Sequence, residues 1–138
     1  MTVRTITPEQ HLDFIRRQRS ASFLQTPAWA KVKSEWRAES LGWFDGGEEP
    51  VGAALVLYRQ LPKVRRYLAY IPEGPLIDWA SGELGDWLAP MTKHLADEGA
   101  FGVRMGPPVV TRTWDAAAVK KGVAEEGIKR LTEIAPAE

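Results

Sequence analysis

The stretch ESLGWFDGGEEPVGAALVLYRQL, residues 39–61, decides the fold because it holds two apolar runs separated by a turn. Asp45-Gly46-Gly47 is typical of a tight turn, since glycine accepts positive φ at little cost. The two runs therefore predict an antiparallel hairpin. The second run, Val51 to Tyr58, is apolar almost throughout, so we expect both of its faces to be covered.

The segments that follow the hairpin extend the predicted sheet. Arg66 to Ile71 predicts a third strand, and Gly82 to Glu98 predicts a helix with apolar residues at helical spacing. Pro90 lies inside that helix and predicts a kink, or two abutting helices. Ala100 to Met105 predicts a fourth strand, and the helix before it suits a parallel connection.

The residues before the hairpin predict two helices. Thr7-Pro8-Glu9-Gln10 is a capping signal for a helix that ends near Gln18. Thr26-Pro27 repeats the signal, and three apolar residues follow at spacings of 3 and 4: Trp29, Val32 and Trp36. They predict an amphipathic helix of about three turns. The expected class is α/β (α+β), a three-stranded meander plus a further strand, with helices covering both faces.

The length of 138 residues suits one compact domain. We expect that domain to span residues 1–112, with a short helical or irregular extension over residues 113–138. In the extension, Ala116 to Ala124 predicts a short helix, and Ile128 to Ile134 one last helical turn.

Composition excludes several kinds of site. The formal net charge is zero, so no global field would hold the chain on nucleic acid or an anionic membrane. Cysteine is absent, and the two histidines, His11 and His94, lack metal-ligand spacing. The sequence shows neither a signal peptide nor an apolar run long enough to span a membrane, and we expect a cytoplasmic protein.

Established catalytic motifs are also missing, and Gly46-Gly47 fits a hairpin turn better than a phosphate loop. A basic cluster surrounds the connection between the second and third strands. It consists of Arg59, Lys63, Arg65 and Arg66. The cluster either protects a sheet edge by charge or contacts phosphate, including RNA backbone.

Two lysines in the second predicted helix differ in position. Lys31 lies about 200° from Trp29 around the helix axis, roughly opposite the apolar face. Lys33 lies at about 40°, at the border of that face. Lys31 should therefore point into water, while Lys33 must extend along tryptophan surface. Lys33 then either reaches water past the rings or presents a point charge to a phosphate.

Three runs in order resemble the Fem family, the FemABX-type peptidyltransferases of peptidoglycan synthesis. They are SFLQTPAWAKVK (22–33), VGAALVLYRQLP (51–62) and LAYIPEGPLIDW (68–79). VRMGPPVV follows where the family has a comparable strand and turn. The resemblance covers most of residues 1–112.

The resemblance implies transfer of amino acids from aminoacyl-tRNA to the peptide of a peptidoglycan precursor, either UDP-linked or lipid-linked. It also implies a pair of acetyltransferase-like (GNAT-like) domains, of which this chain matches half of the first, and no metal or organic cofactor. In the family, the second lysine of the W-A-K-V-K-type run receives precursor phosphate, which maps to Lys33. Trp36 and Arg104 are weaker candidates for the same site, with core packing and a solvated charge as their respective alternatives.

Two departures qualify the resemblance. Full family members are much longer, and the residues thought to position tRNA and the attacking amine mostly lie beyond the end of this chain. Some members carry an acidic residue where this chain has Gly106. We therefore expect a fragment or truncated relative that is inactive alone, and we assign no catalytic residue.

Two other functions stay open. An acyl-CoA-dependent GNAT acetyltransferase would share the fold, but the sequence lacks the usual glycine and basic loop for pyrophosphate. A non-catalytic interaction module would use an exposed sheet edge, which could pair with a second copy.

Overall fold

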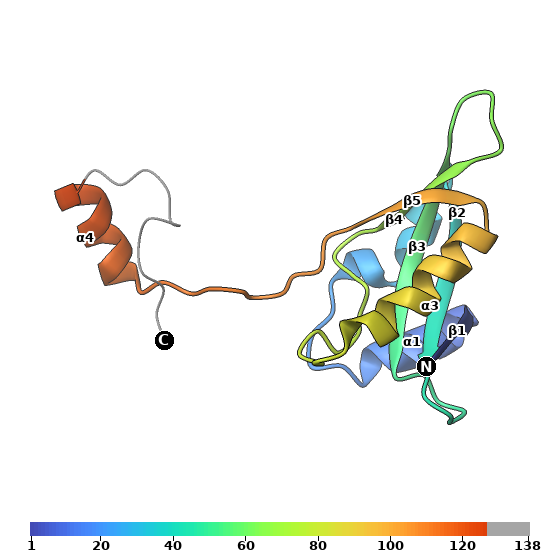
Figure 1. Cartoon of the computed structure of the whole chain (residues 1–138), viewed down its shortest axis with the longest axis horizontal. Helices are drawn as coiled ribbons and strands as arrows, with labels where there is room; N and C mark the ends of the chain where they lie inside the picture. The colour runs from blue at the N-terminus through green and yellow to red at the C-terminus, as the bar shows by residue number, and fades with distance from the viewer. Residues whose placement is uncertain (127–138) are drawn as a thin grey trace. The chain divides into compact units, whose positions relative to one another are not determined.

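The computed structural model describes residues 1–126 of the chain, which form a five-stranded mixed sheet and its helices (Figure 1). The chain divides into two units, Met1–Pro108 and Val109–Glu138, and each is described by itself. The first unit contains β1 Thr2–Thr5, α1 Pro8–Arg16, a 3-10 helix Phe23–Gln25, α2 Pro27–Val32, β2 Arg37–Phe44, β3 Gly52–Gln60, β4 Tyr67–Ile71, α3 Leu84–Asp97 and β5 Ala100–Met105.

The strands lie in the order β1-β2-β3-β4-β5. Neighbours from β1 to β4 are antiparallel, and β4 and β5 are parallel, as the helix between them predicted. The predicted hairpin is confirmed: β2 pairs with β3, and Gly46 takes φ 78° in the turn. β3 is buried from Gly52 to Tyr58, as its apolar run predicted.

The structure contains one strand, β1, that the sequence did not predict, because the predicted order of elements began with a helix. Thr2–Thr5 forms an edge strand whose residues pair with β2 from Phe44 back to Leu41. Only Val3 of this strand packs against the main core. A strand this short and this exposed is held by its partner's hydrogen bonds, so its own sequence shows little apolar periodicity.

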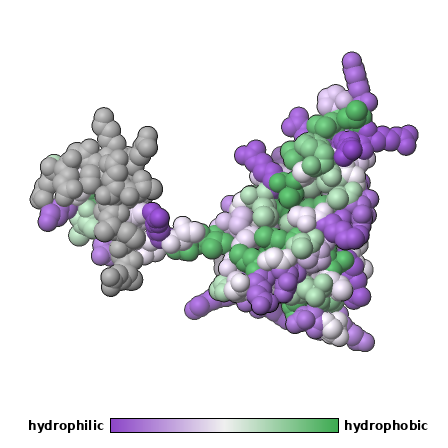
Figure 2. Space-filling view, in the orientation of Figure 1, coloured by the Kyte–Doolittle hydropathy of each residue, from purple (hydrophilic) through white to green (hydrophobic). Residues whose placement is uncertain are grey.

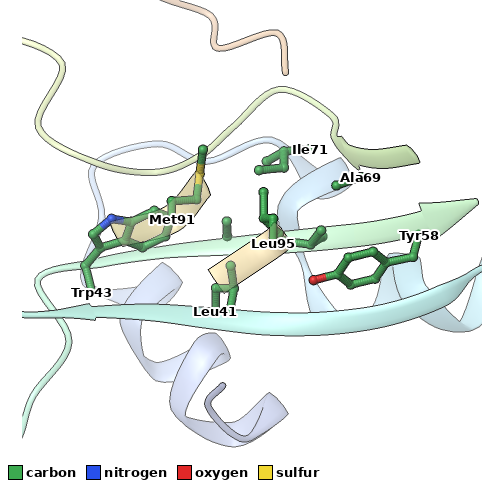
Figure 3. Packing of buried hydrophobic residues seen from close by; sticks show 9 residues of the cluster. Leu41, Trp43, Tyr58, Ala69, Ile71, Met91 and Leu95 are labelled. Atoms are coloured by element: carbon green, nitrogen blue, oxygen red, sulfur yellow. The ribbon is translucent and has the colours of Figure 1, made fainter. Parts of the chain in front are cut away.

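The face of the sheet under α3 holds the main core. Met91 and Leu95 point from α3 onto Leu41 and Trp43 of β2 and Tyr58 of β3 (Figure 3). α3 runs without interruption through Pro90, so the alternative of two abutting helices is wrong.

The opposite face is covered by α1, the 3-10 helix and α2. α1 begins with the predicted capping box, in which Thr7 and Gln10 bond each other's backbone N–H. α2 is shorter than predicted and ends at Val32, because Lys33 leaves helical geometry with φ −94° and ψ 47°. The expected three-turn stripe is therefore wrong: Val32 is exposed, and Trp36 lies beyond the helix, one residue before β2.

The second unit contains α4, Ala116–Glu126, which confirms the short helix predicted there. The last helical turn expected over Ile128 to Ile134 lies outside the described residues. The boundary expected at residue 112 stays a prediction. Among the described helices, none combines the length and the apolar character that crossing a bilayer requires.

Candidate substrate-binding site

The segment before β2 is anchored by one buried side chain, Gln25. Its amide nitrogen donates to the carbonyl oxygens of Leu55 (3.2 Å) and Pro72 (2.7 Å), and its amide oxygen accepts from the Leu55 N–H (3.0 Å). Gly74 makes room for this, because a Cβ there would collide with the Gln25 amide. Gln25 thus ties the start of α2 to β3 and to the end of β4.

This anchor fixes one wall of a hollow of about 240 Å³, which we call the aromatic hollow. Its lining residues are Leu24, Trp29, Lys33, Trp36, Leu57, Tyr70 and Pro72. They come from the 3-10 helix, α2, β3, β4 and the connections that adjoin them. Trp36 and Tyr70 face each other with ring centroids 6.1 Å apart.

Lys33 lies in this hollow. Its Nζ is 5.5 Å from the centre of the Trp29 ring, and the side chain is half-buried, while Lys31 is exposed. Among the described residues, no carboxylate forms an ion pair with Lys33. Lys33 lies beside tryptophan, as the sequence predicted. It does so because α2 ends directly before Lys33, and not because a long helical stripe places it there. An ammonium beside an aromatic wall without a counter-ion is available to an anion.

The other two candidate residues, Trp36 and Arg104, differ in how they lie relative to the hollow. Trp36 lines the hollow directly. Arg104 lies on β5 opposite Tyr70 of β4, so the parallel register puts its side chain on the face of the sheet that carries Tyr70. Arg104 is exposed, and it does not line the hollow itself. Binding roles for all three residues stay predictions.

On the α3 face, a second group of polar side chains is satisfied within the protein. We call Thr5, Glu39, Tyr58 and His94 the Glu39 cluster. Glu39 accepts from the Tyr58 hydroxyl at 2.6 Å, the Thr5 hydroxyl at 2.5 Å and the His94 Nε2 at 3.0 Å. Burial alone would raise the pKa of Glu39, but these hydrogen bonds outweigh it and lower the pKa.

The Glu39 cluster borders the only described group that has metal-ligand chemistry. The ligand atoms of Glu39, His94 and Glu98 lie within 4.8 Å of one another. However, Glu39 already accepts three hydrogen bonds, and Glu98 pairs with Arg37 at 3.0 Å. A metal would have to displace these partners, so we assign the group a structural role.

His11, on the α1 side, is fully buried, whereas His94 is partly buried. The His11 Nδ1 is 2.8 Å from the Ser40 hydroxyl. Burial lowers the pKa of His11 to about 4, and the nearby Gln25 backbone offsets this only in part. His11 is therefore neutral at pH 7 and belongs to the packing under α1.

The sequence did not single out Gln25, Tyr70 or Glu39. Glu39 had a usable signal, because it alternates with Leu41 and Trp43 and so shares their inward face. Tyr70 had the converse signal, since it alternates out of phase with the buried Ala69 and Ile71. Gln25 had none, because its partners are distant backbone atoms, on β3 and directly after β4.

The FemAB family model matches residues 6–135 of the chain. The lipid II:glycine glycyltransferase of Staphylococcus aureus is 28% identical over 147 residues, covering 95% of this chain and 35% of that protein. A crystal structure of FemX superimposes with a TM-score of 0.67 at 27% identity, covering 80% of this chain and 28% of that one.

These comparisons bear on fold and family together. The chain spans about a third of the length of the curated relatives it matches. The likeness to FemX confirms the expected α/β arrangement of the sheet and its helices. Since the family model covers nearly all of the chain, this protein belongs to the FemAB family.

Proposed function

We propose that the aromatic hollow binds the phosphate of a peptidoglycan precursor, with Lys33 as the charged contact and Trp36 as a wall. The observation that carries this proposal is the position of the Lys33 ammonium, beside Trp29 and without an ion-pair partner among the described residues. Arg104, on the adjoining strand, would add long-range attraction for the same anion.

On this proposal the chain is the precursor-binding portion of a Fem-type aminoacyltransferase. The precursor would be a UDP-linked muramyl peptide or its lipid-linked form, and aminoacyl-tRNA would supply the amino acid through another part of the enzyme. The residues lining the hollow include neither a carboxylate nor a histidine, so they can hold an anion but offer no general base at neutral pH. We therefore propose binding, with no aminoacyl transfer by this chain alone, in the cytoplasm where aminoacyl-tRNA is found.

NMR spectra of the tryptophan indole N–H groups test where the precursor binds. Trp29 and Trp36 line the hollow, whereas the Trp43 and Trp79 indoles donate elsewhere, to the carbonyls of Trp87 and Pro75. Titration with UDP-muramyl pentapeptide should shift the Trp29 and Trp36 signals and leave the other two unchanged. Saturable shifts confined to Trp43 or Trp79, or no shift at all, would contradict the proposal.

Self-association through β5 is a second proposal, favoured by one observation. β5 ends the sheet, and Phe101 on it is 53% exposed. An apolar edge strand is suited to pair with a second copy. Light scattering should then report a dimer that Phe101→Ser dissociates, and a monomer at high concentration would contradict this.

A further inference from the structure

The 3-10 helix before α2 presents an aromatic side chain to water. Phe23 is 66% exposed, although the adjoining Gln25 is fully buried. Hydrogen bonds fix this turn. The Ser22 hydroxyl accepts from the Leu24 N–H, and the Phe23 carbonyl accepts from both the N–H and the hydroxyl of Thr26, at 3.1 and 2.6 Å. The fold therefore holds Phe23 in its exposed position.

Phe23 begins a row of apolar side chains that continues along α2. Its ring meets the Trp29 ring edge-on, with centroids 5.5 Å apart. Val32 follows Trp29 by three residues on α2, so the two share a face of the helix, and Val32 is 62% exposed. Single exposed apolar residues are common, but an aligned group of them marks a surface that gains from being covered.

The same part of the chain carries a local excess of positive charge. Residues 14–38 include six cations and one carboxylate, although the formal net charge of the whole chain is zero. The cations are Arg16, Arg17, Arg19, Lys31, Lys33 and Arg37, and the carboxylate is Glu35. Three of the cations pair with carboxylates, and Lys33 lines the hollow. Arg19 and Lys31 are exposed, and none of the ion pairs in the described part of the chain uses them.

Exposed apolar side chains next to free cations suit the surface of an anionic lipid bilayer. Lipid phosphates attract Arg19 and Lys31, and the boundary between headgroups and acyl chains takes up apolar side chains. An RNA backbone would satisfy the same cations but would leave Val32 in water. The exposed apolar row therefore favours a bilayer over RNA.

We propose that residues 19–32 form a membrane contact, in which Phe23 and Val32 enter an anionic bilayer while Arg19 and Lys31 bind lipid phosphates. Each side chain contributes little, so binding should be reversible and should weaken with salt and with the loss of anionic lipid. Neither Phe23 nor Val32 lines the aromatic hollow, so this contact does not depend on the ligand bound there.

Two other exposed residues provide matched controls. Hydrophilic side chains gather over the β3–β4 connection, at the top of Figure 2. Arg65 lies in this connection and is exposed, so Arg65→Glu reverses a charge as Lys31→Glu does, but on another element. Val51, which is 45% exposed just before β3, is the apolar control for Phe23.

The experiment is flotation of the 138-residue chain with vesicles of equal parts phosphatidylglycerol and phosphatidylcholine, and with phosphatidylcholine alone. We expect Phe23→Ser and Lys31→Glu each to weaken binding to the mixed vesicles by about tenfold or more. Val51→Ser and Arg65→Glu should stay within about twofold of the original chain. All four variants should unfold at the same urea concentration as the original chain, because the side chains are exposed.

Several outcomes would overturn the membrane contact. One is the absence of binding to the mixed vesicles, and another is an equal loss in Lys31→Glu and Arg65→Glu. A dimer that Phe23→Ser dissociates would assign the apolar row to a second copy. Binding to an RNA duplex that Lys31→Glu abolishes and Phe23→Ser preserves, without binding to vesicles, would assign the cations to RNA.

The membrane contact and the proposed function fail separately. Lys31→Glu should bind UDP-muramyl pentapeptide like the original chain in the absence of vesicles, because Lys31 does not line the hollow. Loss of vesicle binding with unchanged precursor affinity in this variant supports a separate membrane contact. An equal loss of both would overturn that separation.

Discussion

The two faces of the sheet differ in whether their charged side chains have partners within the protein. On the α3 face, the Glu39 carboxylate accepts three hydrogen bonds, and neighbouring Glu98 pairs with Arg37. On the α1–α2 face, Lys33 lines the aromatic hollow, and no described carboxylate pairs with it. Satisfied charges stabilise a fold, whereas cations without partners are available to a ligand. Changes on the first face should therefore alter stability, and changes on the second should alter binding.

Replacing Glu39 should give the largest loss of stability. Glu39→Ala leaves the buried Tyr58 hydroxyl and the His94 ring without their acceptor, which should cost about 3 kcal/mol of unfolding free energy. Urea denaturation measures this. Glu98→Ala is the control, because its pair with Arg37 is partly exposed and should contribute about 1 kcal/mol or less. A loss no greater than that of the control would show that the cluster does not hold this face together.

Acid should destabilise the two faces in different pH ranges. Burial lowers the pKa of His11 from 6.5 to about 4, so the unfolded chain binds this proton more tightly. The unfolding free energy should then fall by up to about 3 kcal/mol as the pH drops from about 6.5 to 4. The pKa of Glu39 is also lowered, so its contribution is present above its ordinary value of 4.5 and is lost as the pH falls below that value.

Urea denaturation between pH 8 and pH 4 tests the His11 range. His11→Gln cannot titrate and should flatten the curve above about pH 4.5 while leaving the Glu39 range in place. A free energy of unfolding that is the same at pH 7 and pH 5 in the original chain would contradict the assignment to His11.

Gly74→Ala should lower both stability and precursor affinity, although these two properties should otherwise respond to changes on different faces of the sheet. The new Cβ would displace the Gln25 amide from Leu55 and Pro72, at a cost of about 2 kcal/mol. Because Pro72 lines the hollow, precursor binding should weaken as well. Gly82→Ala is the control, since a Cβ there meets no atom within 4 Å. If both variants unfold at the same urea concentration, Gln25 is not the anchor described above.

Much of the fold was predictable because its signals are local. The turn at Asp45-Gly46-Gly47, the capping box at Thr7 and the periodicity of α3 each act within a few residues. β1 and the end of α2 were not predictable in this way. The first is held by pairing with β2, and the second is cut short where the chain turns at Lys33 toward β2.

The candidate site was predictable only in part. Lys33 stood out because it lies among tryptophans, and the family resemblance suggested its ligand. Gln25 depends on contacts with residues far along the chain, namely Leu55 and Pro72. No spacing in one sequence reveals contacts of that kind.

The most direct test of the whole account compares two lysines of one short segment. Calorimetric titration with UDP-muramyl pentapeptide should show binding by Lys33→Ala that is weaker by about 1.5 kcal/mol or more, at least about tenfold, while Lys31→Ala binds like the original chain. Urea denaturation of both variants should agree with the original chain within about 0.5 kcal/mol, because neither lysine supports the core. Equal affinity of the two variants would contradict the claim that the unpaired charge of Lys33 serves to bind the precursor.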